Sequence, residues 1–508
     1  MLLLIACTAP ADPPSANGPD DTGSATDTTH DDAWADLSAE IQAQVDDHLV
    51  PGFTVGVVVD GVLRYHAGFG VTNWGSDERV TDDTIFRWAS VSKMHTAAAL
   101  LRYADAGAIA LDDPATTVLD DVPLAEPFHA SDIHFRHLLD HTSALPDVLP
   151  WECDTSLSES LAAHTPELWA PPGSFYNYTN TGYTWIGATL ERLSGKSFAE
   201  TMKDSLLDPA GMTTATYDAD IATDSPHADG ATMRGDTPYT FRLKKWDCPA
   251  SRPAGWLHGT ATDIARTVEW QLADDGSILS SDSLAAMHAQ VDTFTRPAGT
   301  LKYGMGQLTQ DFDGVDLVWH DGWVTGFVTT WAMVPEAGFG VVIAANADWA
   351  DPYTPMYDAV DNFLGLEHAA PLDGTTDPST WDAFAGTYAD PSLGSIVVTR
   401  TESTLRAEFV DAGVGADLTQ IAERYFYGTL DGNTYFDVRF MGDEGQPASW
   451  FVQRTSVGTR SEEAPFRPTV SREHARAALY RYSFSTPPTP GRVRVTDGPA
   501  PGIGAAMR

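Results

Sequence analysis

The sequence predicts an α/β fold in which an antiparallel sheet carries flanking helices and a large helical insert, followed by a small all-β domain. Strand-like segments lie near both ends of residues 36–365, and the chain between about 110 and 300 has the helical periodicity and the Pro- and Gly-rich loops of an insert. Beyond residue 377, short apolar–polar alternations follow one another between turn signals. Because the strands at the two ends must pair across the insert, we expect an active cleft between sheet and insert.

The domain opens with a helix and a hairpin. Apolar residues recur at helical spacing over about 35–49, which predicts a helix there. Phe53–Val59 and Val62–Phe69 alternate like strands and are joined by Asp60-Gly61, a strong signal for a two-residue turn. These two strands supply the N-terminal part of the sheet.

A long apolar helix is predicted from Ser90 to about Ala106, and Gly107 is well placed to end it. Three further strands are expected at Val315–His320, Val324–Met333 and Phe339–Ala345. The first turn between them falls on Asp321-Gly322. A helix near 354–365 is expected to cover the sheet.

The C-terminal third divides into three parts. Residues 366–377 have the composition of a linker, and residues 378–460 alternate like a small all-β domain. Residues 461–508 differ again: from Arg467 onward seven arginines stand against Glu473 and Asp497, inside a strongly acidic protein. We expect this basic tail to be disordered.

The N-terminus suggests export. Residues 1–7 are interpreted as the remnant of a lipoprotein-type signal, because Leu4-Ile5-Ala6-Cys7 resembles a bacterial lipoprotein processing box with Cys7 as the lipidated residue. The apolar stretch is short and has no basic residue before it. Residues 8–35 have the composition of a disordered linker. The expected location is the bacterial periplasm or cell surface, with the lipid anchor as the only membrane contact.

Cysteine content and charge limit the chemistry further. Cys153 and Cys248 could form a disulfide in an exported protein or remain two separate thiols; the sequence leaves both open. The chain has 71 acidic and 30 basic residues and a net charge of -41. Such a surface repels nucleic acids and anionic lipids, so we expect neither as a partner. The oligomeric state is not predicted.

The first candidate for catalysis is Ser90-Val91-Ser92-Lys93. Residues three apart lie on one face of a helix, so Lys93 can reach the Ser90 hydroxyl. A serine hydroxyl is a weak nucleophile until a neighbouring base activates it. Ser90 also stands at a helix N-terminus, where the free N–H groups favour a developing oxyanion.

Two more motifs follow in order: Tyr178-Thr179-Asn180 in the insert and His320-Asp321-Gly322 at a strand. With Ser90 and Lys93, they resemble the three motifs of the penicillin-recognising serine hydrolase superfamily, which has a β-lactamase/transpeptidase-like fold. That superfamily includes class C β-lactamases, D,D-peptidases, D-aminopeptidases and esterases. The resemblance covers about 36–365, and residues 378–460 resemble the lipocalin-like C-terminal domain of some relatives.

The resemblance implies a role for each motif. Ser90 is the nucleophile, and Lys93 and Tyr178 move the proton. His320 helps to orient the substrate, alongside Asn180 and Gly322. The backbone N–H groups of Ser90 and Trp323 form the oxyanion hole. No metal or other cofactor is expected.

Other enzyme classes have little support. His134, His137 and His141 share one possible helix, but His-Glu-x-x-His is absent, and His137 and His141 look structural. The chain has no Gly-x-Ser-x-Gly elbow and no nucleotide-binding fingerprint.

The third motif departs from that of β-lactam-binding relatives, which place a small hydroxyl residue at the position of Asp321. A second negative charge repels a substrate carboxylate, and Trp323 narrows the mouth of the cleft. We therefore expect a small ester, a D-amino-acid amide or a short peptide as substrate, neutral or cationic. The alternatives are a β-lactamase, or a non-catalytic module that binds penicillin or cell-wall peptides.

Overall fold

The computed structural model describes residues 28–47, 50–147, 155–234, 237–245, 247–288, 291–296, 299–366, 377–430, 434–443, 445–453, 456–461, 471, 472, 475, 476 and 479. Cys7 and Cys153 lie outside these residues, as does most of the expected N-terminal linker. Among the described residues, no helix is both long and apolar enough to cross a membrane. Because Cys7 lies outside the described residues, its lipid anchor stays a prediction.

One large antiparallel sheet forms the centre of the region before the linker, with strand order β2-β1-β12-β11-β10-β9-β8-β7. Its strands are β1 (Gly52–Val59), β2 (Val62–Gly70), β7 (Val291–Arg296), β8 (Gly299–Tyr303), β9 (Leu308–Phe312), β10 (Val315–Val324), β11 (Phe327–Val334) and β12 (Phe339–Ala345). β1 pairs with β12 from Phe53 opposite Ala345 to Val59 opposite Phe339. The expected pairing of strands from the two ends of the domain is thus confirmed.

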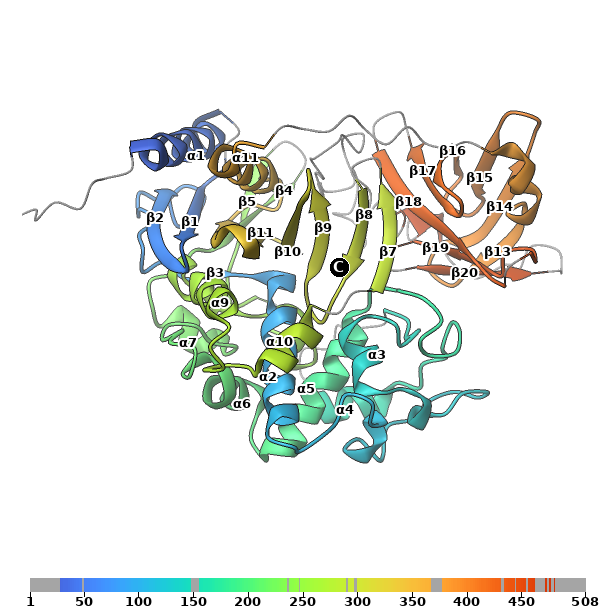
Figure 1. The fold of residues 1–508 in the computed structure, drawn as a ribbon, viewed down its shortest axis with the longest axis horizontal. Helices are drawn as coiled ribbons and strands as arrows, with labels where there is room; N and C mark the ends of the chain where they lie inside the picture. Colours follow the sequence, from blue (N-terminus) through green and yellow to red (C-terminus); the bar gives the residue numbers. More distant parts are fainter. Residues whose placement is uncertain are drawn as a thin grey trace, which may run out of the picture.

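Helices cover both faces of this sheet (Figure 1). α1 (Thr28–Asp47) and α11 (Tyr353–Leu364) pack together on one face, while α9 (Ala261–Ala273) packs on β1, β2 and β12 from the other. α1 begins before the expected helix, so residues 28–35, which the sequence assigned to the linker, are helical.

The insert is mostly helical, as predicted, and lies below the sheet in Figure 1. Its helices are α2 (Ser92–Asp105), α3 (Phe135–Leu139), α4 (Leu157–Ala163), α5 (Asn180–Ser194), α6 (Phe198–Met202), α7 (Ala219–Thr223), α8 (Arg252–Gly255) and α10 (Ser281–Met287). Short strand pairs β3 (Phe86–Arg87) with β6 (His258–Gly259), and β4 (Gly230–Arg234) with β5 (Thr237–Phe241), complete it.

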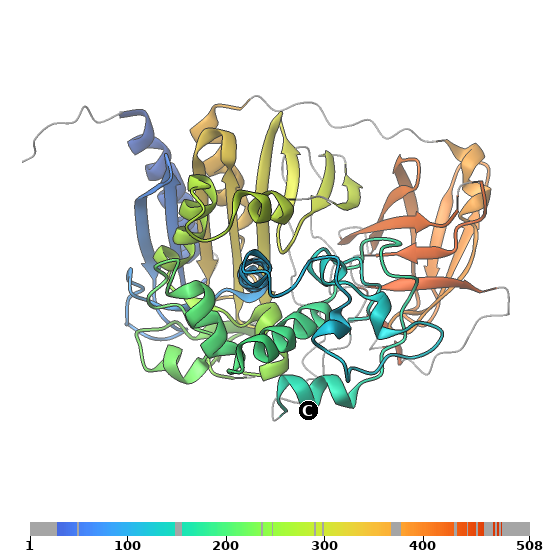
Figure 2. The ribbon, with the colours of Figure 1, turned by 60° about the horizontal axis from the view of Figure 1, so that its bottom comes forward.

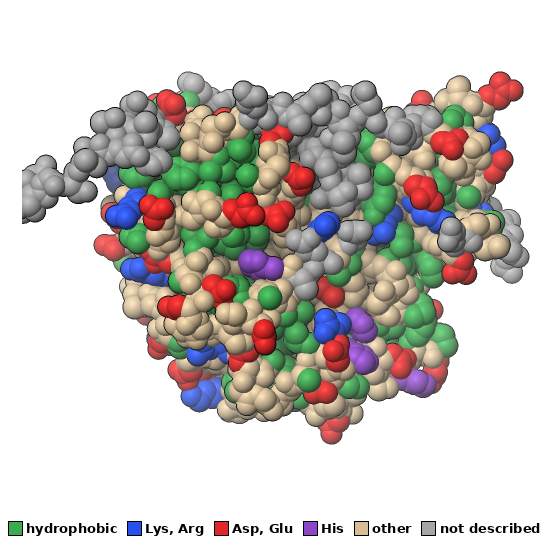
Figure 3. All heavy atoms as spheres, in the orientation of Figure 1, with side chains coloured by type: hydrophobic (Ala, Val, Ile, Leu, Met, Phe, Trp, Pro, Cys, Tyr) green, Lys and Arg blue, Asp and Glu red, His purple; other side chains and the backbone are tan. Residues whose placement is uncertain are grey.

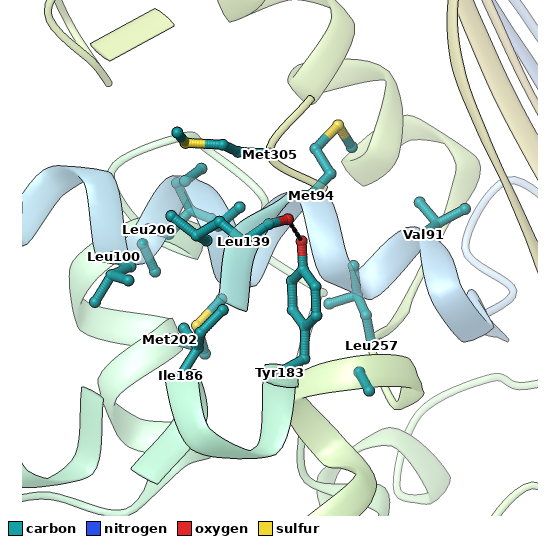
Figure 4. Packing of buried hydrophobic residues seen from close by; sticks show 14 of the residues in the cluster. Val91, Met94, Leu100, Leu139, Tyr183, Ile186, Met202, Leu206, Leu257 and Met305 are labelled. Carbon is teal, nitrogen blue, oxygen red and sulfur yellow. Dashed lines mark hydrogen bonds between the residues drawn. The ribbon is translucent and has the colours of Figure 1, made fainter. Parts of the chain in front are cut away.

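α2 runs through the centre of this insert, and Ser92–Leu101 are buried. Figure 4 shows Met94 and Leu100 of α2 among apolar side chains from α3, α5 and α6. Tyr183 reaches through this core to donate a hydrogen bond to the carbonyl of Leu139 at 2.8 Å. A helix packed on all sides holds its first turn rigidly, which is what a nucleophile requires.

The C-terminal region is a closed antiparallel barrel of eight strands, confirming an all-β unit. The strands are β13 (Gly386–Asp390), β14 (Gly394–Arg400), β15 (Leu405–Phe409), β16 (Val414–Ala422), β17 (Tyr425–Leu430), β18 (Thr434–Met441), β19 (Trp450–Val452) and β20 (Val457–Ser461). Ala475 and Leu479 are buried in the same core, so this part of the expected tail is packed.

The barrel stands beside the sheet and the insert (Figures 1 and 2). Strands β16, β17 and β18 contact β7. The Trp450 indole donates to the carbonyl of Trp169 at 3.2 Å, and its ring centroid lies 5.4 Å from that of Phe175. Phe175 is three residues before Tyr178, so the barrel packs against the segment that carries the predicted catalytic tyrosine.

The Asp321-Gly322 dipeptide is not a turn. β10 continues through it to Val324, with Asp321 opposite Thr330 and Gly322 opposite Thr329 on β11. The chain reverses two residues later, at Gly326, whose φ of 91° suits glycine. The prediction of a turn was wrong because the pairing with β11 satisfies the backbone groups of both residues.

Candidate active site

Ser90 lies in a single 3₁₀ turn, η1 (Ala89–Val91), that leads into α2. Ser90 is partly exposed, whereas all the remaining residues from Thr84 to Leu101 are buried. The Ser92 hydroxyl donates to the carbonyl of Ala89 at 2.6 Å and accepts from the N–H of Leu257 at 2.9 Å. The turn therefore offers one hydroxyl to solvent from a fixed backbone.

Lys93 is completely buried, one turn along from Ser90. Its Nζ lies 3.1 Å from Ser90 Oγ, 2.7 Å from Asn180 Oδ1 and 2.7 Å from the carbonyl oxygen of Ala254. A neutral amine has two N–H bonds and one lone pair. In the structure Nζ donates to all three oxygens. When the amine is neutral, the Asn180 and Ala254 oxygens, which only accept, can hold its two N–H bonds, and the lone pair can then face Ser90. This geometry suits Lys93 as the base that activates the serine.

Tyr178 lies against the same ammonium group. The Lys93 Nζ is 4.8 Å from the centre of the Tyr178 ring and 5.6 Å from that of Tyr183, distances at which a cation is attracted to the ring face. The Tyr178 ring packs on His141 at 4.3 Å, and the N–H of Thr179 donates to His141 Nδ1 at 3.1 Å. His141 thus shapes the tyrosine loop, in line with the structural role expected for it.

Asp147 is a residue that the sequence analysis missed. Its carboxylate accepts from the backbone N–H of Asn180 at 2.8 Å and from Asn180 Nδ2 at 3.3 Å. Because a carboxylate only accepts, it fixes the Asn180 amide with Oδ1 toward Lys93. No spacing pattern in the sequence marks Asp147, because its partner Asn180 lies 33 residues further along the chain.

The third motif approaches the nucleophile from the sheet. A Cβ atom on Gly322 would stand 2.6 Å from the carbonyl oxygen of Trp88 and 3.0 Å from Ala89 Cβ, so only glycine allows β10 to come this close. The Thr329 hydroxyl reinforces the contact by donating to the Trp88 carbonyl at 3.0 Å. Gly322 therefore brings the backbone of its neighbour Trp323, one of the expected oxyanion donors, beside the turn of Ser90.

The side chains of Asp321 and Trp323 project from the face of β10 opposite to that of His320. Thr330, which pairs with Asp321, contacts the Met356 sulfur of α11 at 3.0 Å, so this face of the strand points away from Ser90. Asp321 is 3% exposed, and its Oδ1 lies 3.6 Å from His320 Nδ1. The Trp323 indole donates to the carbonyl of Asp348 at 3.3 Å. Both side chains therefore lie on the face of β10 opposite Ser90, and the predicted effect of Asp321 on a substrate carboxylate has to act through charge.

His320 is completely buried on the Ser90 side of β10. Its ring centroid lies 6.3 Å from that of Tyr178, and its Nε2 lies 3.1 Å from the hydroxyl of Tyr303. The structure therefore gathers Ser90, Lys93, Tyr178, Asn180 and His320 around one point, and adds Asp147 and Tyr303.

Asp348 holds the end of β10 in place. Its Oδ2 accepts from the N–H of Gly326 at 3.2 Å, its N–H donates to Ala231 at 3.1 Å, and its side chain is 3% exposed. Burial raises the pKa of this carboxyl from about 3.8 to about 6.

The stability of the protein should respond to this shift. Asp348→Asn keeps an oxygen that accepts from Gly326 but removes the ionisation. The folded protein holds the Asp348 proton to a higher pH than the unfolded chain does. As the pH rises from about 4 to about 6, the free energy of unfolding of the wild type should therefore fall relative to that of the variant. Above about pH 6 the difference between the two free energies should stay constant. Urea titrations across this range measure it, with the exposed Asp77→Asn as the control for the loss of one charge; a flat difference for Asp348→Asn contradicts the prediction.

Within the described part of the chain, no three His, Cys, Asp or Glu side chains are grouped so that they could hold a metal ion. His134 and His137 lie side by side at 5.2 Å between ring centroids, and the backbone N–H of His134 donates to His137 Nδ1. Cys248 is buried and disulfide-bonded.

Comparison with known proteins gives a consistent result. The family model described as Beta-lactamase matches residues 37–364. Penicillin-binding protein 4 of Amycolatopsis lactamdurans is 30% identical over 364 residues, covering 67% of this chain and 94% of the relative. The D-alanyl-D-alanine-carboxypeptidase/endopeptidase AmpH of Escherichia coli K12 is 25% identical over 61% of this chain and 83% of its own length. The solved structure of SurE with D-Leu superposes with a TM-score of 0.67 at 22% identity, covering 85% of this chain and all of SurE.

Proposed function

Because this chain belongs to the beta-lactamase family, we propose that it is a serine hydrolase that cleaves an ester or an amide through an acyl-enzyme on Ser90. The observation that carries the proposal is the partly exposed Ser90 hydroxyl, which lies 3.1 Å from the Nζ of the buried Lys93.

The reaction follows from these contacts. Ser90 Oγ attacks the substrate carbonyl carbon while its proton passes to Lys93 Nζ. The negative charge on the carbonyl oxygen is stabilised by the backbone N–H groups of Ser90 and Trp323. When the tetrahedral intermediate collapses, the leaving alcohol or amine takes a proton from the Lys93–Tyr178 pair. Water then attacks the ester on Ser90 and gives a proton to the same pair. When the second tetrahedral intermediate collapses, the bond to Ser90 Oγ breaks, the pair returns the proton to Ser90 Oγ, and the acid leaves.

Two acidic side chains next to the motifs favour a neutral or cationic substrate. Asp147 contacts Asn180, and Asp321 lies beside His320. The Asp321 side chain projects from the face of β10 that points away from Ser90, so it acts on the substrate through its charge rather than by contact. A negative charge near a cleft of low dielectric constant repels an anionic substrate without touching it. The chain is also acidic overall, and Figure 3 shows Asp and Glu side chains scattered over the visible face.

The names of the relatives agree with a small acyl substrate. AmpH is named as a carboxypeptidase and endopeptidase for D-alanyl-D-alanine, and SurE is solved with D-Leu. We therefore propose a small ester, a D-amino-acid amide or a short peptide as substrate. We also propose that the protein acts outside the cytoplasm, tethered through Cys7.

A substrate panel with a covalent serine probe tests the function. Wild type, Ser90→Ala and the exposed control Ser277→Ala are each given a fluorophosphonate probe, a short-chain nitrophenyl ester, a D-alanyl anilide and a chromogenic cephalosporin. We expect labelling and turnover of ester or anilide in wild type and Ser277→Ala, and neither in Ser90→Ala. Cephalosporin turnover far above both other substrates would indicate a β-lactamase. Labelling that persists in Ser90→Ala, or no labelling of the wild type, would support a binding module.

A further inference from the structure

Tyr303 is a buried residue that contacts the third motif from another strand. It ends β8, and its ring is completely buried. β9 separates β8 from β10, but it pairs with β10 only up to Trp319, so His320 is the first residue beyond that pairing. There the Tyr303 hydroxyl lies 3.1 Å from His320 Nε2.

The contacts of His320 define its tautomer. Nδ1 lies 2.5 Å from the carbonyl oxygen of Asp321, and a carbonyl oxygen only accepts. Nδ1 therefore carries the proton. In a neutral imidazole Nε2 is then the acceptor, so the Tyr303 hydroxyl, which also hydrogen-bonds the Tyr183 hydroxyl, directs its proton to Nε2. Both ring nitrogens are engaged, and the ring is fixed in plane and in orientation.

Tyr303 also connects His320 with the tyrosine loop. Its ring packs on His141 at 4.7 Å, on Tyr176 at 5.5 Å and edge-on against Tyr178 at 6.4 Å. Burial among these rings raises the pKa of the Tyr303 hydroxyl well above its usual value, so the group keeps its proton.

We propose that Tyr303 is a positioning residue for the hydrolysis: by donating to Nε2 it holds His320 as the neutral Nδ1–H tautomer and fixes the end of β10 that carries the oxyanion donor Trp323. This inference rests on the proposed serine hydrolysis for its effect on rate, but the tautomer itself does not depend on turnover. The titratable groups that face His320 are Tyr303 from β8, Tyr178 from the loop before α5, and Asp321 from its own strand.

The test compares Tyr303→Phe with Tyr388→Phe. Tyr388 is a matched control, because it is also completely buried and its hydroxyl is also hydrogen-bonded. It lies in the barrel and donates to the carbonyl of Phe384 at 2.8 Å. Tyr303→Phe leaves Nε2 without its donor, which makes protonation of the ring easier. We expect kcat to fall about tenfold with little change in KM, and the acidic limb of kcat/KM to move to higher pH. Tyr388→Phe should change neither.

A spectroscopic measurement tests the inference even without a substrate, and a double-mutant comparison of rates tests it once a substrate is known. In protein labelled with ¹⁵N-histidine, the His320 signals, assigned with His320→Gln, should report an Nδ1–H tautomer in wild type and a raised pKa in Tyr303→Phe. In a His320→Gln background, Tyr303→Phe should have a smaller effect on rate than in wild type. An Nε2–H tautomer in wild type, or an unchanged His320 titration in folded Tyr303→Phe, would overturn the inference. Failure of Ser90-dependent hydrolysis would overturn only the proposed function.

Discussion

Replacing Lys93 with methionine is expected to lower kcat/KM about 10³-fold or more. The amine is the group that lies 3.1 Å from the Ser90 hydroxyl, and methionine supplies no base there. Methionine fills a similar volume, and the side chain it replaces is completely buried, so the variant should remain folded. The loss should appear in kcat, because the base acts in the chemical step.

The control for this prediction is Lys196→Met, which removes an exposed lysine that forms an ion pair with Asp204. Exposed pairs contribute little, so this variant should match the wild type in activity and nearly match it in stability. Steady-state turnover of the best panel substrate and the rate of probe labelling at Ser90 give the comparison. If Lys93→Met labels and turns over as fast as Lys196→Met, Lys93 is not the base.

The Ser90–Lys93 pair could be predicted because its geometry is local. Two residues three positions apart on a helix meet whatever the rest of the chain does. The Tyr178 and His320 motifs are distant in sequence, and their placement followed from the family resemblance rather than from any periodicity. The hairpin of β1 and β2 was also predictable, since Asp60-Gly61 determines the turn and the alternation determines the faces.

Contacts between separate elements could not be predicted. Asp147 approaches Asn180 from a loop 33 residues earlier, and Tyr303 reaches His320 past the end of an intervening strand. Neither contact leaves a spacing pattern in the sequence. Asp321-Gly322 misled the prediction for a related reason: the dipeptide is a common turn signal, but this glycine is needed for close approach rather than for a turn.

The close approach of Gly322 to the Ser90 turn leads to the second prediction with a large expected effect. Gly322→Ala should reduce kcat/KM by about 10²-fold or more and lower the free energy of unfolding by about 1–3 kcal/mol. The added Cβ would stand 2.4 Å from the Thr329 hydroxyl and 2.6 Å from the Trp88 carbonyl oxygen. Both neighbours belong to packed backbone or to a buried strand, so β10 must move away from the Ser90 turn. A displaced Trp323 N–H no longer matches the developing oxyanion, and the loss falls on kcat.

Gly340→Ala separates this effect from simple destabilisation. Gly340 lies in β12 of the same sheet, and a Cβ there would stand 2.4 Å from Val268 Cγ1 and 3.0 Å from the carbonyl oxygen of Ala332. Both variants should lose stability in urea titrations, but only Gly322→Ala should lose turnover per folded molecule, because Gly340 contacts α9 and β11 rather than η1. Equal specific activity in the two variants would show that β10 does not set the geometry of the oxyanion site. If only Gly322→Ala loses turnover, the close contact of Gly322 with the Ser90 turn is what positions the third motif against Ser90.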